Sequence, residues 1–258
     1  MFVDFGRFKL EVLDIAPQVL GLPPIVLLHE GLGCVAMWRD FPHALAAATS
    51  ARVVVYSRYG YGRSTPLPAG ARNVRKASFM HKEAIEIAPL LLAKLNIENP
   101  FLVGHSDGGS IALIHAATFP NAVCGVAAMA PHCFVEELSV HNIAEATTAF
   151  ETTDLPARLS KYHLDSAATF YGWNDVWLSA EFRAWNITEL LNAIACPVLA
   201  VQGEQDQYGT MAQIDVIADR VPTARLRKLA QCGHSPWKDA RDTVLTEILN
   251  HFRFCTQK

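Results

Sequence analysis

The chain has 258 residues, of which 51% are hydrophobic, and its formal net charge is -3 at pH 7. This length and composition suffice for one well-buried α/β core that carries an insertion. No basic cluster is interleaved with aromatic residues, and no apolar run approaches the ~18 residues that a membrane span needs. We therefore expect a small-molecule substrate and neither nucleic acid nor a membrane as partner. The oligomeric state stays open.

The cysteines argue against a metal centre. They are scattered without C-x-x-C spacing, and no pair of histidines has metal-site spacing with an acidic partner. The six positions are Cys34, Cys124, Cys133, Cys196, Cys232 and Cys255. Since the N-terminus lacks a basic region followed by an apolar signal segment, we expect reduced thiols and a cytoplasmic location, with no metal.

Apolar strands alternate with helical patterns along most of the chain. The pattern predicts an N-terminal hairpin and then a doubly wound, mostly parallel sheet, which is an α/β fold class. A helix over 79–95 should cover one face of this sheet, because its apolar residues recur at helical spacing. The predicted strands are 2–5, 9–12, 25–29, 52–56, 101–103, 123–129, 197–203 and 224–229.

The pattern changes between residues 132 and 195, where strand signals thin out and aromatic residues concentrate. Helical stretches at 143–150 and 154–164 predict a helical cap, inserted after the strand that follows the helix at 109–113. Such an insertion is too long for a bare loop and would close a pocket over the sheet. We therefore divide the chain into a core (1–131 and 196–258) and a cap (132–195). The aromatic residues of the cap are Phe170, Tyr171, Trp173, Trp177, Phe182 and Trp185.

A Gly-His-Ser-Asp-Gly sequence at 104–108 marks the first candidate for chemistry. It lies between the apolar strand 101–103 and the small-residue helix 109–113. This is the context of a nucleophile elbow, in which a serine occupies a sharp strand-to-helix turn and glycines on either side allow close backbone approach. A serine before a helix is more often an N-cap, so the motif alone leaves both interpretations open. The context favours Ser106 as a nucleophile.

An acid and a base follow the serine in chain order. Asp206 comes after the strand 197–203, and His234 comes after the strand 224–229. The order serine, aspartate, histidine, each at the carboxyl end of a predicted strand, is that of the α/β hydrolases. Glu136 and Glu137 are alternative acids, but they fall within the start of the predicted cap.

The glycine-containing loop after strand 25–29 is the candidate oxyanion hole. The backbone N–H of Gly31, together with that of Asp107, would stabilise the oxyanion of a tetrahedral intermediate. We interpret His29 as a structural residue that fixes this loop.

With these motifs in place, the sequence resembles the α/β-hydrolase fold family over nearly its whole length. The resemblance is to cap-bearing esterases, carbon–carbon bond hydrolases and cofactor-free haloperoxidases. It rests on the loop His29-Glu30-Gly31, the turn at 58–64, the elbow, the acid strand and Gly233-His234. It implies a Ser–His–Asp hydrolase that uses no metal or organic cofactor.

Two residues depart from the pattern of the family. Most relatives carry glycine where this chain has Glu30, and many carry aspartate where it has Ser57. A carboxylate beside the oxyanion loop would oppose developing negative charge unless it is paired or turned away. One interpretation pairs Glu30 with Arg58 or Arg63, and the other has Glu30 contact a polar or cationic part of the substrate.

Three further residues join Glu30 as candidates for substrate binding: His132, Trp173 and Tyr208. The leading hypothesis for the reaction is hydrolysis of a carboxylic ester or related acyl bond through an acyl-enzyme. Carbon–carbon bond hydrolysis of the ring-cleavage type and perhydrolysis would use the same residues. The fold also serves as a small-molecule receptor, so that a binding role without turnover remains an alternative.

Overall fold

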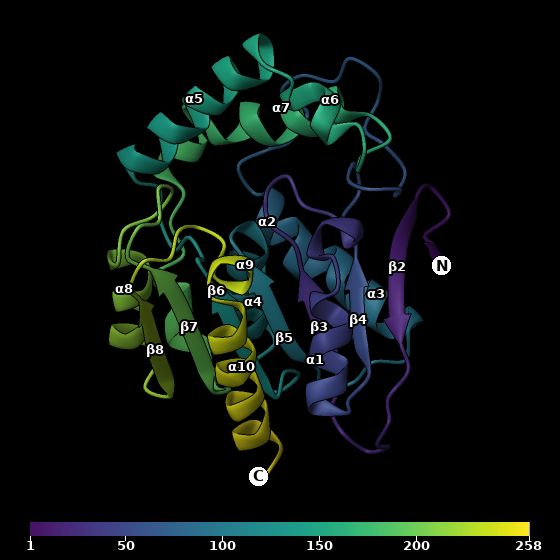
Figure 1. The fold of residues 1–258 in the computed structure, drawn as a ribbon, viewed down its shortest axis with the longest axis vertical. Helices are drawn as coiled ribbons and strands as arrows, with labels where there is room; N and C mark the ends of the chain where they lie inside the picture. The colour runs from purple at the N-terminus through teal and green to yellow at the C-terminus, as the bar shows by residue number, and fades with distance from the viewer. Residues whose placement is uncertain (258) are drawn as a thin grey trace.

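The computed structural model describes residues 1–257, which form an eight-stranded sheet in the order β1-β2-β4-β3-β5-β6-β7-β8 (Figure 1). The strands are β1 (Phe2–Asp4), β2 (Lys9–Ile15), β3 (Ile25–Leu28), β4 (Val53–Tyr56), β5 (Phe101–His105), β6 (Gly125–Met129), β7 (Val198–Gly203) and β8 (Ala224–Leu229). The β1–β2 and β2–β4 pairs are antiparallel, and every other pair is parallel. The predicted doubly wound, mostly parallel sheet is confirmed.

Helices cover both faces of the sheet, which explains the uninterrupted apolar runs in the sequence. Every residue of β3, β4, β5, β6 and β7 is buried, as expected where parallel strands are sandwiched between helices. Figure 1 shows α1 (Phe41–Thr49) and α10 (Arg241–Thr256) in front of the sheet. The helices α3 (Ala88–Lys94) and α4 (Asp107–Thr118) lie behind it. The two larger apolar clusters lie one on each face of the sheet.

The helix expected over 79–95 contains a wider turn. It runs as α2 (Phe79–Lys82), a π-helical turn at Glu83–Ile87, and α3. Pro89 lies in the first turn of α3 and has no N–H to donate to the preceding turn. The helix widens to π-helical geometry in the residues just before this proline, where the missing N–H interrupts the α-helical hydrogen-bond pattern.

Three helices lie above the carboxyl ends of the parallel strands, as Figure 1 shows: α5 (Glu137–Thr152), α6 (Leu155–Leu159) and α7 (Ser166–Trp177). The helix α6 is shorter than the expected 154–164, because the ring of His163 binds two backbone groups of the core, Gly62 N–H and Leu32 O. Within the described residues, no helix is both long and apolar enough to cross a membrane.

The remaining helices are short and lie between the elements described above. They include α8 (Ala212–Arg220), α9 (Pro236–Asp239) and 3-10 turns at Val35–Trp38, Phe182–Ala184 and Leu190–Ala193. Five of the six aromatic side chains noted in the 132–195 segment are buried and join the core, and Tyr171 is partly exposed. They therefore act mainly as packing residues between the helices and the sheet.

Candidate active site

Ser106 occupies a strained turn between β5 and α4. Its backbone has φ 53° and ψ -121°, a conformation that non-glycine residues rarely adopt. A Cβ on Gly104 would lie 2.2 Å from the carbonyl oxygen of Gly108, and one on Gly108 would lie 2.1 Å from that of Leu28. Only glycine fits at these two positions, which explains why the turn needs both. The turn therefore has the geometry expected of a nucleophile elbow.

The structure brings the side chains of Ser106, His234 and Asp206 into one hydrogen-bonded chain. The hydroxyl oxygen of Ser106 lies 2.9 Å from Nε2 of His234, and Nδ1 of His234 lies 2.8 Å from Oδ1 of Asp206. Because an ionised carboxylate only accepts hydrogen bonds, Nδ1 carries the proton and Nε2 can accept from the serine. Three segments that are distant in the sequence thus meet at the carboxyl ends of the parallel strands.

The surroundings of Asp206 keep it ionised. Its carboxylate accepts hydrogen bonds from the Gln202 side chain at 2.7 Å and from the Tyr208 N–H at 2.8 Å. Burial opposes ionisation, but the hydrogen bond and charge of His234 and the hydrogen bond from the Tyr208 N–H lower the pKa of Asp206 below its usual value. The alternative acids lie elsewhere, since Glu136 binds Thr210 and Gln213 while Glu137 pairs with Arg183.

Gly31 and Asp107 both line a cavity beside Ser106. Asp107 is the first residue of α4, where backbone N–H groups lack partners within the helix and favour negative charge. A Cβ on Gly31 would lie 2.1 Å from the indole nitrogen of Trp173, so this loop passes directly beneath α7.

His29 fixes the loop that contains Gly31. Its Nδ1–H donates to the carbonyl oxygen of Glu30 at 2.7 Å, and its Nε2 accepts from the Arg58 backbone N–H at 3.1 Å. Burial and the neighbouring guanidinium lower the pKa of His29 well below its usual range, so the ring is neutral. The side chain of Arg58 donates to the same Glu30 carbonyl at 2.8 Å.

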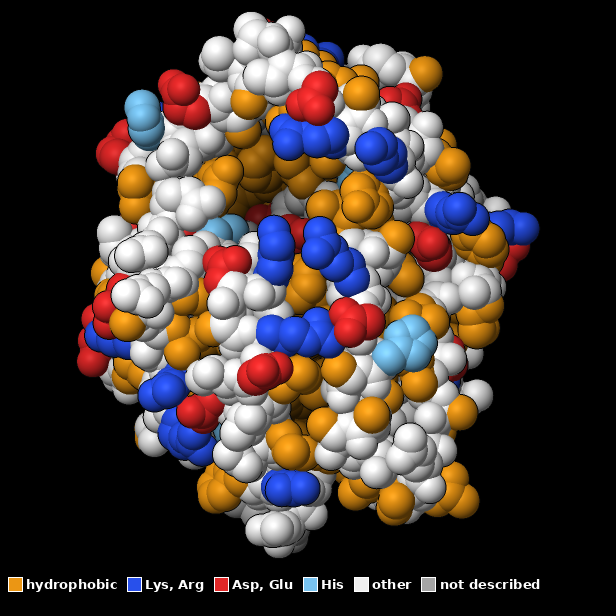
Figure 2. All heavy atoms as spheres, in the orientation of Figure 1, with side chains coloured by type: hydrophobic (Ala, Val, Ile, Leu, Met, Phe, Trp, Pro, Cys, Tyr) orange, Lys and Arg blue, Asp and Glu red, His pale blue; other side chains and the backbone are white. Residues whose placement is uncertain are grey.

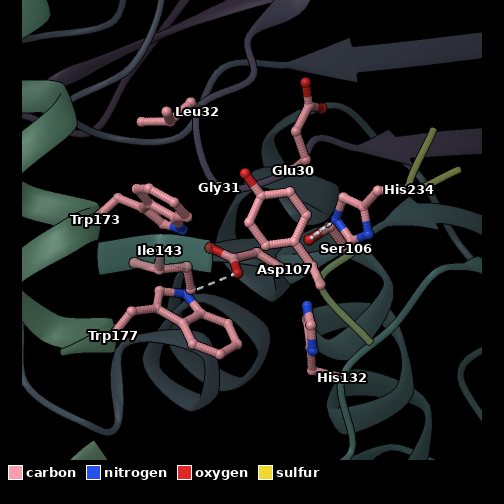
Figure 3. Close-up of a pocket in the computed structure, with 11 residues that line it drawn as sticks. Glu30, Gly31, Leu32, Ser106, Asp107, His132, Ile143, Trp173, Trp177 and His234 are labelled. Atoms are coloured by element: carbon pink, nitrogen blue, oxygen red, sulfur yellow. Dashed lines mark hydrogen bonds between the residues drawn. The ribbon is translucent and has the colours of Figure 1, made fainter. Parts of the chain in front are cut away.

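The cavity has a volume of about 120 Å³, and its residues come from both the sheet and the helices above it (Figure 3). Figure 2 shows a hollow between these two parts of the molecule, with hydrophobic side chains on its walls. All four candidate binding residues line the cavity. Sequence reasoning missed Leu32, Ile143 and Trp177 as lining residues. The lining residues are Glu30, Gly31, Leu32, Ser106, Asp107, His132, Ile143, Trp173, Trp177, Tyr208 and His234.

A buried carboxylate lies at the polar side of the cavity. Oδ1 of Asp107 accepts a hydrogen bond from the indole N–H of Trp177 at 3.2 Å, and its Oδ2 lies 3.6 Å from Nη1 of Arg58. Burial raises the pKa of Asp107, and the guanidinium of Arg58 limits this effect. Oδ2 has no hydrogen-bond partner in the protein, and neither does Nη1 of Arg58.

His132 and Tyr208 lie on the side of the cavity nearest His234. Burial lowers the pKa of His132 to about 3, so its ring is neutral at physiological pH. The rings of Tyr208 and His234 have centroids 4.8 Å apart, and those of His132 and Trp177 are also 4.8 Å apart. Both candidate residues therefore contact the site through ring faces and edges.

The pairing of Glu30 with Arg58 or Arg63 is wrong. The Glu30 carboxylate faces Nδ1 of His105 at 3.5 Å, while the guanidinium of Arg58 contacts Asp107 and the backbone carbonyl of Glu30. The backbone N–H of Arg63 donates instead to Glu11. Sequence reasoning could not find His105 as the partner of Glu30, because the contact joins the loop after β3 to the end of β5, which meet only after the sheet has formed.

Residues 1–257 contain no group of three His, Cys, Asp or Glu side chains arranged to hold a metal ion. A mostly parallel sheet, a strained serine at a strand-to-helix turn, and a histidine and aspartate on later loops define the class of α/β hydrolases. The chain belongs to the alpha/beta hydrolase family, because a model of that family matches residues 25–247.

Curated relatives agree with this class. The chain is 27% identical over 188 residues to serine hydrolase BPHL of Homo sapiens, a match that covers 71% of this chain and 63% of the human protein. The chain thus spans less than two-thirds of that relative. Proline iminopeptidase of Lactobacillus delbrueckii subsp. bulgaricus is 22% identical over 275 residues, which covers 92% of this chain and 91% of that enzyme.

Solved structures share the fold over the whole chain. A crystal structure from a study of carboxylesterases of Nitrososphaera gargenis superposes with a TM-score of 0.79. The alignment covers 100% of this chain and 99% of that one at 19% identity. At this identity the likeness concerns the fold alone.

Proposed function

We propose that this hydrolase cleaves a carboxylic ester or related acyl bond of a small molecule, with Ser106 as nucleophile, His234 as base and Asp206 as acid. The observation that carries the proposal is the hydrogen-bonded chain from Ser106 Oγ through the His234 ring to Asp206, with distances of 2.9 Å and 2.8 Å. These are the contacts that activate a serine hydroxyl, and they lie at the wall of a cavity.

In the proposed reaction His234 removes the hydroxyl proton while the oxygen of Ser106 attacks the substrate carbonyl. Asp206 holds the imidazole in the required tautomer and stabilises its protonated form. The N–H groups of Gly31 and Asp107 stabilise the tetrahedral oxyanion, and each such donor lowers the barrier by about 3 kcal/mol. His234 then protonates the leaving group, and water cleaves the acyl-enzyme by the same steps.

The cavity favours a small acyl or aryl group. Its volume of about 120 Å³ is somewhat below the roughly 150 Å³ of an engineered cavity that holds benzene. Ile143, Trp173 and Trp177 supply the apolar wall, and all three belong to the helices above the sheet. We accordingly propose that residues 132–195 act as a cap that limits the length of the substrate.

Turnover of a p-nitrophenyl ester series from acetate to decanoate tests the proposal. We expect the wild-type protein to prefer the short esters, because the cavity is small. The Ser106→Ala variant should keep the fold, measured by circular dichroism, and lose serine-dependent release. Mass spectrometry of the wild-type protein should place the trapped acyl group on Ser106.

An acyl group on another residue would refute the assignment of Ser106. Absence of release by folded wild-type protein would instead favour carbon–carbon bond hydrolysis or a receptor role. A dienoate substrate and a ligand titration separate those two outcomes.

A further inference from the structure

His105 holds the backbone of the proposed base. It is the last residue of β5, directly before Ser106, and its side chain is buried, with 1% exposure. Its Nε2 lies 2.6 Å from the carbonyl oxygen of His234. A carbonyl oxygen only accepts hydrogen bonds, so Nε2 must carry a proton and donate it. The residue beside the nucleophile thus fixes the main chain of the base.

The opposite ring nitrogen of His105 faces the oxyanion loop. Nδ1 lies 3.5 Å from Oε2 of Glu30 and 3.3 Å from the indole nitrogen of Trp237. The carboxylate can accept a hydrogen bond from a protonated Nδ1, whereas the indole can only donate to an unprotonated one. Glu30 therefore favours the doubly protonated ring, and Trp237 favours the neutral ring.

The loop is built to bring the Glu30 carboxylate to this position. Figure 3 shows the Glu30 side chain directed away from Ser106, although the residue also lines the cavity. A Cβ on Gly33 would lie 2.4 Å from Oε2 of Glu30, so glycine at that position leaves the space that the carboxylate occupies. The Glu30 carbonyl is meanwhile held by His29 and Arg58.

The electrostatics of the two groups support an ion pair. Burial opposes ionisation of Glu30, but the hydrogen bond and charge of His105 lower the pKa of Glu30 to about 2. Burial also disfavours the charged ring of His105, yet Glu30, the His234 carbonyl and Asp206 together raise its pKa above the usual value. The aromatic neighbours of the ring are Trp38 and Trp237, which carry no charge, and the imidazole of His234, whose ring centroid lies 5.2 Å away.

We propose that Glu30 and His105 form a positioning pair: the charged ring of His105 fixes the backbone of His234 and cancels the Glu30 charge beside the oxyanion hole. This inference rests on the proposed role of Ser106 and His234. A hydrogen bond from a charged donor is stronger than one from a neutral donor, so the pair holds the base more firmly than a neutral ring would. It also explains how a carboxylate is tolerated next to developing negative charge.

Steady-state kinetics on the preferred ester test the pair in four variants: His105→Phe, His105→Gln, Glu30→Gln and the double variant Glu30→Gln/His105→Phe. We expect His105→Phe to lower kcat on the order of 10²-fold with little change in KM, because the base loses its anchor and Glu30 is left uncompensated. His105→Gln keeps an amide donor and should retain more activity than His105→Phe. Adding Glu30→Gln to His105→Phe should recover kcat on the order of 10-fold, since the unpaired charge is removed.

The matched control is His115→Gln. His115 is also a buried histidine that binds a backbone carbonyl, that of Ala84 at 2.7 Å, but it lies away from the cavity. Its replacement should leave kcat and KM unchanged. If the effects of Glu30→Gln and His105→Phe simply multiply, or if Glu30→Gln alone raises KM at constant kcat, the pair is rejected and Glu30 instead contacts substrate.

A spectroscopic measurement separates this inference from the proposed function. In the Ser106→Ala background, which has no turnover, nuclear magnetic resonance of ¹⁵N-histidine-labelled protein at neutral pH should show two ring N–H protons on His105. Glu30→Gln should reduce them to one, and loss of the signals in His105→Gln assigns them. One ring proton with Glu30 present overturns the pair. Two ring protons in a protein that cleaves no ester would leave the pair standing and reject the esterase activity.

Discussion

Individual side chains in this site are held by several partners each, so their orientation does not depend on a single contact. Asp206 illustrates this, because it receives hydrogen bonds from Gln202 and from the Tyr208 N–H besides that of His234. These donors stabilise the ionised carboxylate and leave it only as an acceptor toward Nδ1 of His234. The tautomer of His234, the proposed base, is therefore set by the hydrogen bonds of Asp206.

Changing Asp206 to Asn should remove this control. An asparagine amide can donate to Nδ1 of His234, which moves the ring proton to Nε2 and prevents it from accepting the proton of Ser106. We expect kcat on the preferred ester to fall by about 10⁴-fold, with KM little changed.

The matched control for this prediction is Asp239→Asn. Asp239 binds the backbone N–H of Gly233 in the same loop at 3.1 Å but does not contact the ring of His234. Its kcat should stay within a few-fold of the wild-type value. Equal losses in the two variants would show that the loop, and not the tautomer, limits the rate.

At the scale of elements, the helices α5–α7 are tied to the core through His163, which lies in the loop between α6 and α7. Its Nδ1 accepts from the Gly62 N–H at 2.9 Å, and its Nε2–H donates to the Leu32 carbonyl at 3.0 Å. Burial lowers the pKa of His163, which keeps the ring neutral and lets it serve as donor and acceptor at once. One ring thus joins the helical segment to the loop of Gly31.

His163→Ala should loosen this connection. The change leaves Gly62 N–H and Leu32 O without their partner, and each unsatisfied buried group costs about 1–3 kcal/mol. We expect a lower Tm in differential scanning calorimetry and faster cleavage between α6 and α7 by a protease. His141→Ala, at an exposed position of α5, is the control and should change neither quantity. Identical cleavage rates in wild type and His163→Ala would contradict a tethering role.

The elements that the sequence predicts well are those whose signal is local. Continuous apolar runs predict the parallel strands β3 to β7, and the two glycines around Ser106 predict the strand-to-helix turn. The partner of Glu30, the end of α6 at Leu159 and the cavity residue Ile143 were missed, because each depends on contacts between segments far apart in the chain. Residue spacing carries no information about such contacts.

For the whole molecule, buried neutral histidines make stability depend on pH. Burial lowers the pKa of the partly buried His81 and of five buried histidines: His29, His115, His132, His163 and His251. Below about pH 6.5 the unfolded chain binds protons at these rings that the folded protein does not, so stability falls as the pH is lowered. His105, whose pKa is raised, acts in a different range, because its contribution to stability is lost as the pH rises above about 6.5.

His251 permits a measurement of one such contribution. It is buried in α10, and burial lowers its pKa to about 4. As the pH is lowered from about 6.5 to that value, His251 should lower the free energy of unfolding by up to about 1.4 kcal/mol per pH unit. In urea denaturation at several pH values, the free energy of unfolding of His251→Gln should depend less steeply on pH than that of the wild type. The exposed His43→Gln is the matched control, and an unchanged slope in His251→Gln would refute the assignment.

The close approach of Glu30 to Gly33 also constrains which substitutions the two positions can accept during evolution. While Glu30 is present, any side chain at position 33 would collide with its carboxylate, because a Cβ there would lie 2.4 Å from Oε2 of Glu30. Once glycine replaces Glu30, that collision disappears, and the remaining close contact of such a Cβ is with the Cβ of His29 at 2.9 Å. A substitution at position 33 should thus be less harmful in a lineage that first lost Glu30 than in this background. The order of the two mutations, and not only their identity, decides which sequences are reachable.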